Sequence, residues 1–254
     1  MRIAITIAGS DSCGGAGVQL DLKIFEKLGV YGLSAITAVT AQNTVGVQKI
    51  NKVPPRIIAA QIDSVIKDIG ADACKIGMLY SSVVVTQVAE RIRRHSIRNV
   101  VLDTVLSAKD GSPFLGRVGI KQLRRFLIPQ ALVVTPNVPE AEILSGIRVQ
   151  NPDDMKCAAR KIHDMGCGYV LLKGGHLEGN PIDLMYDGCD FTEIPGIRVE
   201  GPPVHGTGCA LSASIAARLA LGDSVPDAVV FAKTFVRELI ESAISLGKGN
   251  LLIV

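Results

Sequence analysis

Short runs of β-branched and aliphatic residues alternate with helical patterns along the chain, and this alternation limits the possible folds more than any other feature. Residues 3–8 form a continuous apolar run bounded by Gly9, as expected for a strand buried on both faces. The next segment, 18–28, has leucine or isoleucine at every fourth position, which predicts a helix. Strands that alternate with helices of about 10–15 residues form βαβ units and a parallel sheet covered on both faces.

The same alternation continues to the end of the chain. Further strands are expected at 31–40, 73–77, 100–103, 132–135, 170–173 and 184–186, an extended piece at 45–53, and helices at 55–69, 83–94, 120–126, 139–145, 153–165, 207–220 and 226–246. No stretch has the composition of a linker and no internal repeat is present, which favours one α/β domain over residues 1–254. About eight strand–helix units would also suit a (β/α)₈ barrel, which stays open as the alternative fold.

Composition and charge exclude several classes of protein. With 254 residues and 48% hydrophobic residues, the chain is long enough to form a core without disulfides or a structural metal. Its net charge of +3 is too small and too scattered for a nucleic-acid or polybasic membrane surface, and no apolar run reaches bilayer-spanning length. The six cysteines form no CxxC pair and are expected to be reduced. We therefore expect a soluble, cytoplasmic protein that binds neither nucleic acid nor membrane.

Several common catalytic motifs do not occur in the sequence. It lacks GxxxxGK[ST], a GxGxxG after the first strand, HExxH and GxSxG, which argues against Walker-type, dinucleotide-binding, metalloprotease and esterase sites. The four histidines show no metal-ligand spacing, and none is assigned a role here.

The most informative local feature is the turn PPVHGTGC before a helical run of small residues. Glycines at the start of a helix leave several amides unpaired at the positive end of the helix dipole, which suits phosphate or a developing oxyanion. An ordinary turn capped by Thr207 is the alternative. Cys209 follows the turn, where the dipole favours a thiolate that acts as base or nucleophile. By spacing alone, a small buried hydrophobe is the better interpretation of Cys209.

Acids and a lysine stand at the ends of other predicted strands. Asp103 ends one strand and Glu140 follows the next, so the two carboxylates are candidates to hold Mg²⁺, although Glu140 also suits the first turn of a helix. Lys173 ends a further strand and is a candidate phosphate contact, or a solvated turn residue. The glycine-rich loop after the first strand is flanked by Asp11 and Asp21, and Asp21 also suits a solvated helix position. Together these features favour a phosphate-handling enzyme.

Seven motifs then occur in a familiar order between residues 6 and 216: TIAGSDSCGGAGVQLDLKIFEKLGVYG, TAVTAQNTVGVQ, KIGML, VLDTVLSAKDG, TPNVPEAEIL, LLKGGHLEG and HGTGCALSASIA. The chain resembles the hydroxymethylpyrimidine/phosphomethylpyrimidine kinases of thiamine biosynthesis, a branch of the ribokinase-like superfamily. The resemblance implies a three-layer αβα fold with a mostly parallel sheet, ATP and Mg²⁺ as cofactors, and a homodimer. It also implies two reactions, phosphorylation of 4-amino-5-hydroxymethyl-2-methylpyrimidine and then of its monophosphate.

The resemblance also implies site roles. Gln42 would hold the aminopyrimidine edge, Gly9, Asp21 and Met78 would line the pocket, and Val105 would pack on the ring. Gly206, Thr207, Gly208 and Cys209 would form the anion hole, with Cys209 as the base where most ribokinase relatives have Asp. Asp103 and Glu140 would organise Mg²⁺, and Asn137, Lys173 and Thr207 would face the nucleotide phosphates.

Three segments depart from the family pattern: SAKDG at 107–111, EGPPV before His205, and the carboxyl end GKGNLLIV. The first is expected to alter closure over the second substrate. Two other functions stay open, a pyridoxal/pyridoxine kinase of the same superfamily and a non-catalytic ligand sensor.

Overall fold

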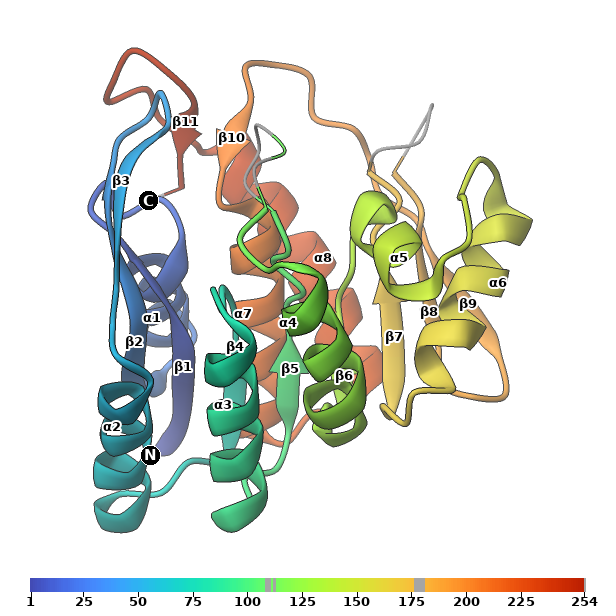
Figure 1. Cartoon of the computed structure of the whole chain (residues 1–254). Helices are drawn as coiled ribbons and strands as arrows, with labels where there is room; N and C mark the ends of the chain where they lie inside the picture. The colour runs from blue at the N-terminus through green and yellow to red at the C-terminus, as the bar shows by residue number, and fades with distance from the viewer. Residues whose placement is uncertain (108–110, 112, 176–180, 254) are drawn as a thin grey trace.

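The computed structural model describes residues 1–107, 111, 113–175 and 181–253 and has an α/β architecture (Figure 1). Its strands are β1 (Arg2–Asp11), β2 (Val30–Gln42), β3 (Val47–Lys52), β4 (Ala73–Ile76), β5 (Val100–Leu102), β6 (Val133–Val134), β7 (Tyr169–Leu172), β8 (Asp183–Tyr186), β9 (Phe191–Ile194), β10 (Val204–His205) and β11 (Leu251–Leu252). Its α-helices are α1 (Gly17–Lys27), α2 (Pro55–Asp68), α3 (Ser82–Arg94), α4 (Arg117–Gln122), α5 (Val138–Ser145), α6 (Pro152–His163), α7 (Thr207–Leu221) and α8 (Val225–Glu241).

The main sheet has nine strands in the order β3-β2-β1-β4-β5-β6-β7-β8-β9. Strands β1, β2, β4, β5, β6 and β7 are parallel, whereas β3, β8 and β9 are antiparallel to their neighbours. The sheet is open, with β3 and β9 at its edges, so the barrel alternative is wrong. From β1 the chain passes first to β2 on one side and later to β4 on the other. Loops diverge at such a switch point, which leaves room for a ligand.

Helices cover both faces of the sheet, as the three-layer prediction requires (Figure 1). Side chains alternate along the strands, so that Leu102 of β5 packs toward α2, α3 and α6, and Val101 packs toward α1, α7 and α8. Helix α7 is buried on nearly all sides, and its many alanines let it lie close to both α1 and α8. Its amino terminus is thereby fixed against the sheet edge where the parallel strands end.

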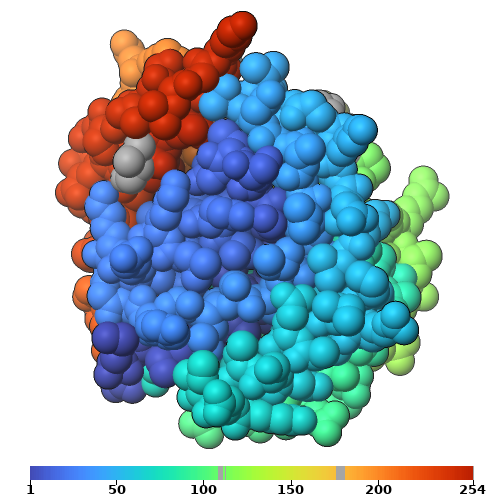
Figure 2. All heavy atoms as spheres, turned by 90° about the vertical axis from the view of Figure 1, so that its left-hand side faces the viewer, coloured from blue at the N-terminus to red at the C-terminus, as the bar shows by residue number. Residues whose placement is uncertain are grey.

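Some elements differ from the sequence expectations. The helix expected at 120–126 begins at Arg117 and continues as a π-helical turn over Leu123–Leu127. The final helix ends at Glu241 rather than near 246, because the chain turns back there. Gly249 then packs on Thr44, where a Cβ would lie 2.1 Å from the carbonyl oxygen. Figure 2 shows this carboxyl-terminal segment beside the β2–β3 hairpin.

Strands β9, β10 and β11 were not expected, since short strands carry little periodicity of their own. Residues 108–110 of the SAKDG loop, on which the expected change in closure depends, lie outside the described residues. Within the described part of the chain, no helix has the length and apolar character needed to cross a bilayer.

Candidate active site

A cavity of about 630 Å³ opens at the carboxyl ends of the parallel strands, beside the switch point at β1. It extends from the ends of β1 and β2, past the loops after β4, β5, β6 and β7, to the start of α7. The residues expected in the site that line it are Gly9, Gln42, Met78, Asp103, Val105, Asn137, Glu140, Lys173, Gly206, Thr207, Gly208 and Cys209. Asp21 is the exception, and its place is described below.

The amino terminus of α7 forms one wall of the cavity. Gly206 is the N-cap in the left-handed region, with φ of +85°, and a Cβ on it would lie 1.9 Å from the carbonyl oxygen of Gly15. The alternative turn capped by Thr207 is therefore wrong. The first helical hydrogen bond runs from the amide of Ala210 to the carbonyl of Gly206 at 2.8 Å. Among the described residues, nothing accepts from the amides of 207–209, so these donors are available to an anion.

Cys209 is half-buried on the cavity wall in the first turn of α7. Burial raises the pKa of its thiol to about 11, and Asp103 and Asp21 act in the same direction. The charge of Lys75 and the backbone amide of Gly17 oppose this rise without cancelling it. The raised pKa does not agree with the thiolate at neutral pH that the helix position alone favours. Cys209 nevertheless lines the cavity, although it also packs against the core on the α1, α7 and α8 face of the sheet.

Asp103 follows β5 and is almost fully buried at the cavity floor. Its Oδ1 accepts from Nζ of Lys173 at 3.2 Å and from Thr135 at 3.3 Å, and its Oδ2 accepts from Ser212 at 3.2 Å. Burial alone would raise the pKa of Asp103, but the charges of Lys173 and Lys75 outweigh it and lower the pKa. The carboxylate is therefore ionised, and Lys173 lies with its ammonium group near the glycine turn.

Glu140 has a structural role and also lines the cavity. It forms a capping box with Asn137: its amide donates to Oδ1 of Asn137 and its Oε2 accepts from the Asn137 amide, both at 2.9 Å. Thr104 donates to the same Oε2 at 3.0 Å. The alternative reading of Glu140 as a first-turn helix acid is thus confirmed.

The two acids also fit a divalent cation. Burial raises the pKa of Glu140, and the charge of Asp103 adds to that rise, so a cation beside both groups would relieve their repulsion. Mg²⁺ commonly uses one or two carboxylates and completes its shell with water and phosphate oxygens.

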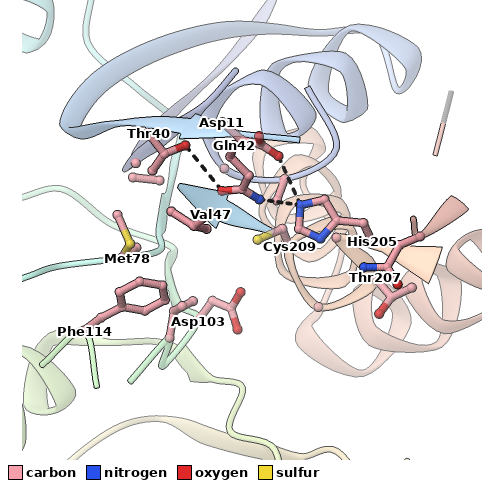
Figure 3. Close-up of a pocket in the computed structure, with 18 of the residues that line it drawn as sticks. Asp11, Thr40, Gln42, Val47, Met78, Asp103, Phe114, His205, Thr207 and Cys209 are labelled. Carbon is pink, nitrogen blue, oxygen red and sulfur yellow. Dashed lines mark hydrogen bonds and ion pairs between the residues drawn. The ribbon is translucent and has the colours of Figure 1, made fainter. Parts of the chain in front are cut away.

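The end of the cavity opposite the start of α7 is apolar and is called the slot here (Figure 3). Met78, Val105, Phe114 and Val47 line it. Gly9 lies close beside Met78: a Cβ at this position would lie 2.5 Å from Cε of Met78, so a larger residue would displace the end of that side chain. At one edge of the slot the amide of Gln42 lies between Thr40 and His205 (Figure 3). One polar amide beside apolar walls is suited to a planar heteroaromatic ring.

Asp21 does not line the cavity as expected. Its side chain is fully buried, where it accepts from Thr6 at 2.6 Å and from Nζ of Lys75 at 2.8 and 3.0 Å. The solvated-helix alternative for Asp21 is wrong as well. A helix residue facing the sheet meets the buried strand β4, and Lys75 on that strand supplies the compensating charge.

Sequence reasoning gave no role to three residues that line the cavity, Lys75, His205 and Asp11, although Asp11 is named there as a flank of the glycine-rich loop. A lysine inside the buried run 73–77 was a usable indication, because a charge in a buried strand needs a partner. His205 and Asp11 gave no comparable indication, since they lie 194 residues apart in the sequence.

An open αβα sheet, a glycine turn at a helix amino terminus, and two acids with a lysine at the same edge define a small-molecule kinase of the ribokinase-like class. The chain belongs to the phosphomethylpyrimidine kinase family, whose sequence model matches residues 11–253. It is 43% identical to the hydroxymethylpyrimidine/phosphomethylpyrimidine kinase of Bacillus subtilis, over 97% of this chain and 92% of that protein. It is 44% identical to the enzyme of the same name from Escherichia coli, over 97% and 94%.

Solved structures agree on the fold. A phosphomethylpyrimidine kinase from Clostridium difficile superposes with a TM-score of 0.85 and 40% identity, over 94% of this chain and all of that one. The ADP complex of a Bacillus subtilis pyridoxal kinase superposes with a TM-score of 0.92 and 36% identity, over 100% of this chain and 97% of that one. A Staphylococcus aureus pyridoxal kinase in complex with AMP-PCP and pyridoxal superposes with a TM-score of 0.92 and 32% identity, over 100% of this chain and 93% of that one. The resemblance stated from the motifs is therefore confirmed.

Proposed function

We propose that this chain transfers the terminal phosphoryl group of ATP to 4-amino-5-hydroxymethyl-2-methylpyrimidine, and then phosphorylates the monophosphate to the diphosphate, in thiamine biosynthesis. The observation that carries this proposal is one continuous cavity with the Gln42 amide and an apolar slot at one end and the unpaired amides of α7 at the other. The family membership supports the same reaction.

The slot would bind the pyrimidine by shape and by two hydrogen bonds. An aminopyrimidine edge presents one N–H donor beside one ring-nitrogen acceptor, and a primary amide such as that of Gln42 offers the complementary pair. Val105 and Met78 would contact the ring faces. Such contacts hold the hydroxymethyl group at a fixed place in the cavity, which is the main contribution a kinase makes to its acceptor.

The start of α7 would stabilise the charge on the transferred group. Within the described part of the chain, the amides of Thr207, Gly208 and Cys209 have no acceptor, and Lys173 lies beside them as a cation. Phosphoryl transfer asks little covalent chemistry of the protein, so donors fixed in place before the reaction carry much of the rate. Asn137 has its side-chain oxygen committed to the helix cap, which leaves its amide nitrogen for a nucleotide phosphate.

Asp103 and Glu140 would hold Mg²⁺ between them and the nucleotide. The bound cation supplies neutralisation of phosphate charge. The ammonium group of Lys173 offsets part of the negative charge of Asp103 and Glu140 at this end of the cavity.

Cys209 would accept the proton of the hydroxymethyl group. Because its pKa is raised to about 11, the thiol is mostly protonated near neutral pH, and only its thiolate fraction acts as a base. In a loose, metaphosphate-like transition state the acceptor oxygen has formed little of its bond to phosphorus, so its hydroxyl proton is transferred to the sulfur late, as that bond is completed. In the second reaction the acceptor is already an anion, so the thiol is less important there.

The test is phosphorus NMR of the products formed from the pyrimidine alcohol and MgATP. Sequential appearance of a monophosphate and a diphosphate, together with ADP, is expected. Absence of both products contradicts the proposal, and ADP release on adding the alcohol excludes a non-catalytic sensor. The expected homodimer and cytoplasmic location stay predictions, and sedimentation equilibrium tests the dimer.

A pyridoxal kinase is the second candidate, favoured by the TM-scores of 0.92 with two pyridoxal kinases. With the hydroxymethyl groups superposed, pyridoxal has its aldehyde, which has no N–H to donate, where the pyrimidine has its amino group, and a ring hydroxyl where the pyrimidine has a ring nitrogen, so Gln42 favours the pyrimidine. A ratio of kcat/KM values that favours the pyridine alcohol would replace the main proposal with this one.

A further inference from the structure

Four polar side chains meet at the edge of the apolar slot and form one network (Figure 3). Oγ1 of Thr40 lies 3.3 Å from Oε1 of Gln42, and Nε2 of Gln42 lies 2.8 Å from Nε2 of His205. The same His205 nitrogen lies 3.1 Å from Oδ2 of Asp11. A primary amide exchanges its oxygen and nitrogen by a half-turn about its last bond, so the network decides which of them faces each neighbour.

Thr40 has only one hydroxyl hydrogen to donate. Its oxygen lies 3.0 Å from the carbonyl of Ser10, which can only accept, and 3.3 Å from Gln42. The shorter contact takes the hydrogen. An amide oxygen facing Thr40 would then meet a lone pair, whereas an amide N–H facing Thr40 would find an acceptor.

The contacts of His205 lead to the same orientation of the Gln42 amide. Burial acts to raise the pKa of Asp11, but the contact with His205 and the amides of Cys13 and Gly15 lower it below its usual value, so Asp11 is an ionised acceptor. The His205 nitrogen that faces Asp11 must therefore carry a hydrogen. A protonated Nε2 cannot accept from the Gln42 amide nitrogen, but it can donate to an amide oxygen in the same place.

We propose that Asp11 and His205 are positioning residues that hold the Gln42 amide with its oxygen toward His205 and its nitrogen toward Thr40. The His205 Nε2–H is shared between Gln42 and Asp11. The ring packs closely on Gly15: its Cδ2 lies 2.7 Å from the position that a Cβ would take there. This inference rests on the proposed function and specifies how its substrate is selected and oriented.

The fixed amide determines how an aminopyrimidine lies in the slot. The Gln42 oxygen on the His205 side accepts from the amino group, and the nitrogen on the Thr40 side donates to the ring nitrogen. The hydroxymethyl carbon is attached next to the amino-bearing carbon, on the side away from that ring nitrogen. It is therefore directed toward His205 and the start of α7, which lie together on one side of Gln42 (Figure 3). The opposite amide orientation would direct it toward Thr40.

The test compares binding of two pyrimidines by titration calorimetry: the 4-amino alcohol and its 4-oxo analogue, which has the reversed donor and acceptor pattern. The wild-type protein should prefer the amino compound by about 100-fold or more, because the analogue leaves polar groups unpaired. In His205→Phe the amide is free to turn and serve either pattern, so the preference should fall below about tenfold. The affinity for ATP should stay within about twofold.

Two further variants sharpen the comparison. Asp11→Asn should reduce the preference in the same direction. His95→Phe is the matched control, because His95 also pairs with an aspartate, Asp63, at 2.6 Å but does not line the cavity. It should keep the full preference. A preference that survives His205→Phe, or that is absent from the wild type, overturns the inference.

A second measurement uses the wild-type protein, so it does not depend on whether a variant folds. Nitrogen-15 NMR of histidine-labelled wild-type protein should show a protonated Nε2 on His205, and an unprotonated Nε2 overturns the inference. Failure of the proposed function gives a different result, namely preferential binding of the amino alcohol with no phosphoryl transfer to it.

Discussion

The ammonium group of Lys75 donates to both carboxylate oxygens of Asp21, at 3.0 and 2.8 Å, and neither side chain is exposed. Burial alone would lower the pKa of Lys75, but Asp21 together with the other acidic groups near it, among them Asp103, outweighs burial and raises the pKa, so the lysine stays charged at the cavity wall. The ion pair thus holds the ammonium group of Lys75 in a buried position near Cys209.

Breaking this pair should strongly destabilise the fold. Lys75→Met leaves a buried carboxylate without its cation, which typically costs about 3–5 kcal/mol in the free energy of unfolding. The double variant Asp21→Asn/Lys75→Met should recover part of that loss, and urea denaturation measures both. Arg2→Met is the control, because the Arg2–Asp72 pair is exposed, and it should cost less than about 1 kcal/mol. Equal effects of Lys75→Met and Arg2→Met contradict this account.

Replacing Cys209 should separate turnover from binding. Cys209→Ala is expected to keep the affinity for the pyrimidine and to lose most of kcat on the alcohol, with a smaller loss on the monophosphate. Cys157→Ala, an exposed cysteine away from the cavity, should behave as wild type. Near wild-type kcat in Cys209→Ala would refute the assignment of the base.

The pH dependence tests the same thiol. A base must lose its proton to act, and the pKa of Cys209 is raised to about 11, so kcat on the alcohol should rise with pH from 7 to 9. Below its pKa, the thiolate fraction grows about tenfold for each pH unit. The Cys209→Ala variant should lack this rise. A flat profile in the wild type, measured where chemistry limits turnover, argues against a thiolate base.

Glu140→Gln should separate the helix cap from the cation site. Glutamine at this position can still accept from the Asn137 amide, so the capping box persists and stability should change by less than about 1 kcal/mol. The loss of a charged ligand should raise the Mg²⁺ concentration needed for half-maximal rate by about tenfold or more. Activity titrations with Mg²⁺ and thermal unfolding give the two quantities. An unchanged Mg²⁺ requirement would remove Glu140 from the cation site.

Gly206→Ala should disable the glycine turn. A Cβ there would lie 1.9 Å from the Gly15 carbonyl oxygen at a φ of +85°, so the turn must shift and its amides lose their alignment. Turnover should fall by about 10²-fold or more, as for loss of a fixed anion donor. Gly222→Ala is matched in backbone conformation, with φ of +105° at the other end of α7, but nothing lies within 4 Å of its Cβ. It should cost stability without affecting turnover.

Gln42→Ala should raise KM for the pyrimidine far more than KM for ATP, since Gln42 lies at the slot end of the cavity. Steady-state kinetics with each substrate varied in turn gives both constants. Equal increases would contradict the assignment of Gln42 to the pyrimidine.

The residues that could be placed from the sequence are those whose role is local. The apolar run 3–8 lies in β1, and Gly206 begins α7 as the glycine turn indicates. Choosing between a barrel and an open sheet was not possible, because the pairing of β1 with both β2 and β4 is a long-range property. By spacing alone the sequence favours a small buried hydrophobe at Cys209, and the raised pKa of its thiol follows from burial, about which local helix geometry contains no information.

Long-range partners explain the remaining differences. In the sequence Asp21 has the pattern of an ordinary amphipathic-helix residue. Only the structure shows that it pairs with Lys75, which lies 54 positions away. The same holds for Asp11, Gln42 and His205, which come from three separate segments. Pairings of this kind have no signature within a window of one helix or strand.

The short parallel pairing of β10 with β11 has a practical consequence for handling the protein. Leu252 pairs with His205, so the carboxyl-terminal residues brace the segment that enters the glycine turn. Met1, by contrast, is exposed just before β1, at the end of the strands opposite the cavity (Figure 1). Affinity tags and surface-immobilisation handles therefore belong at the amino end, where they leave the geometry around the histidine undisturbed.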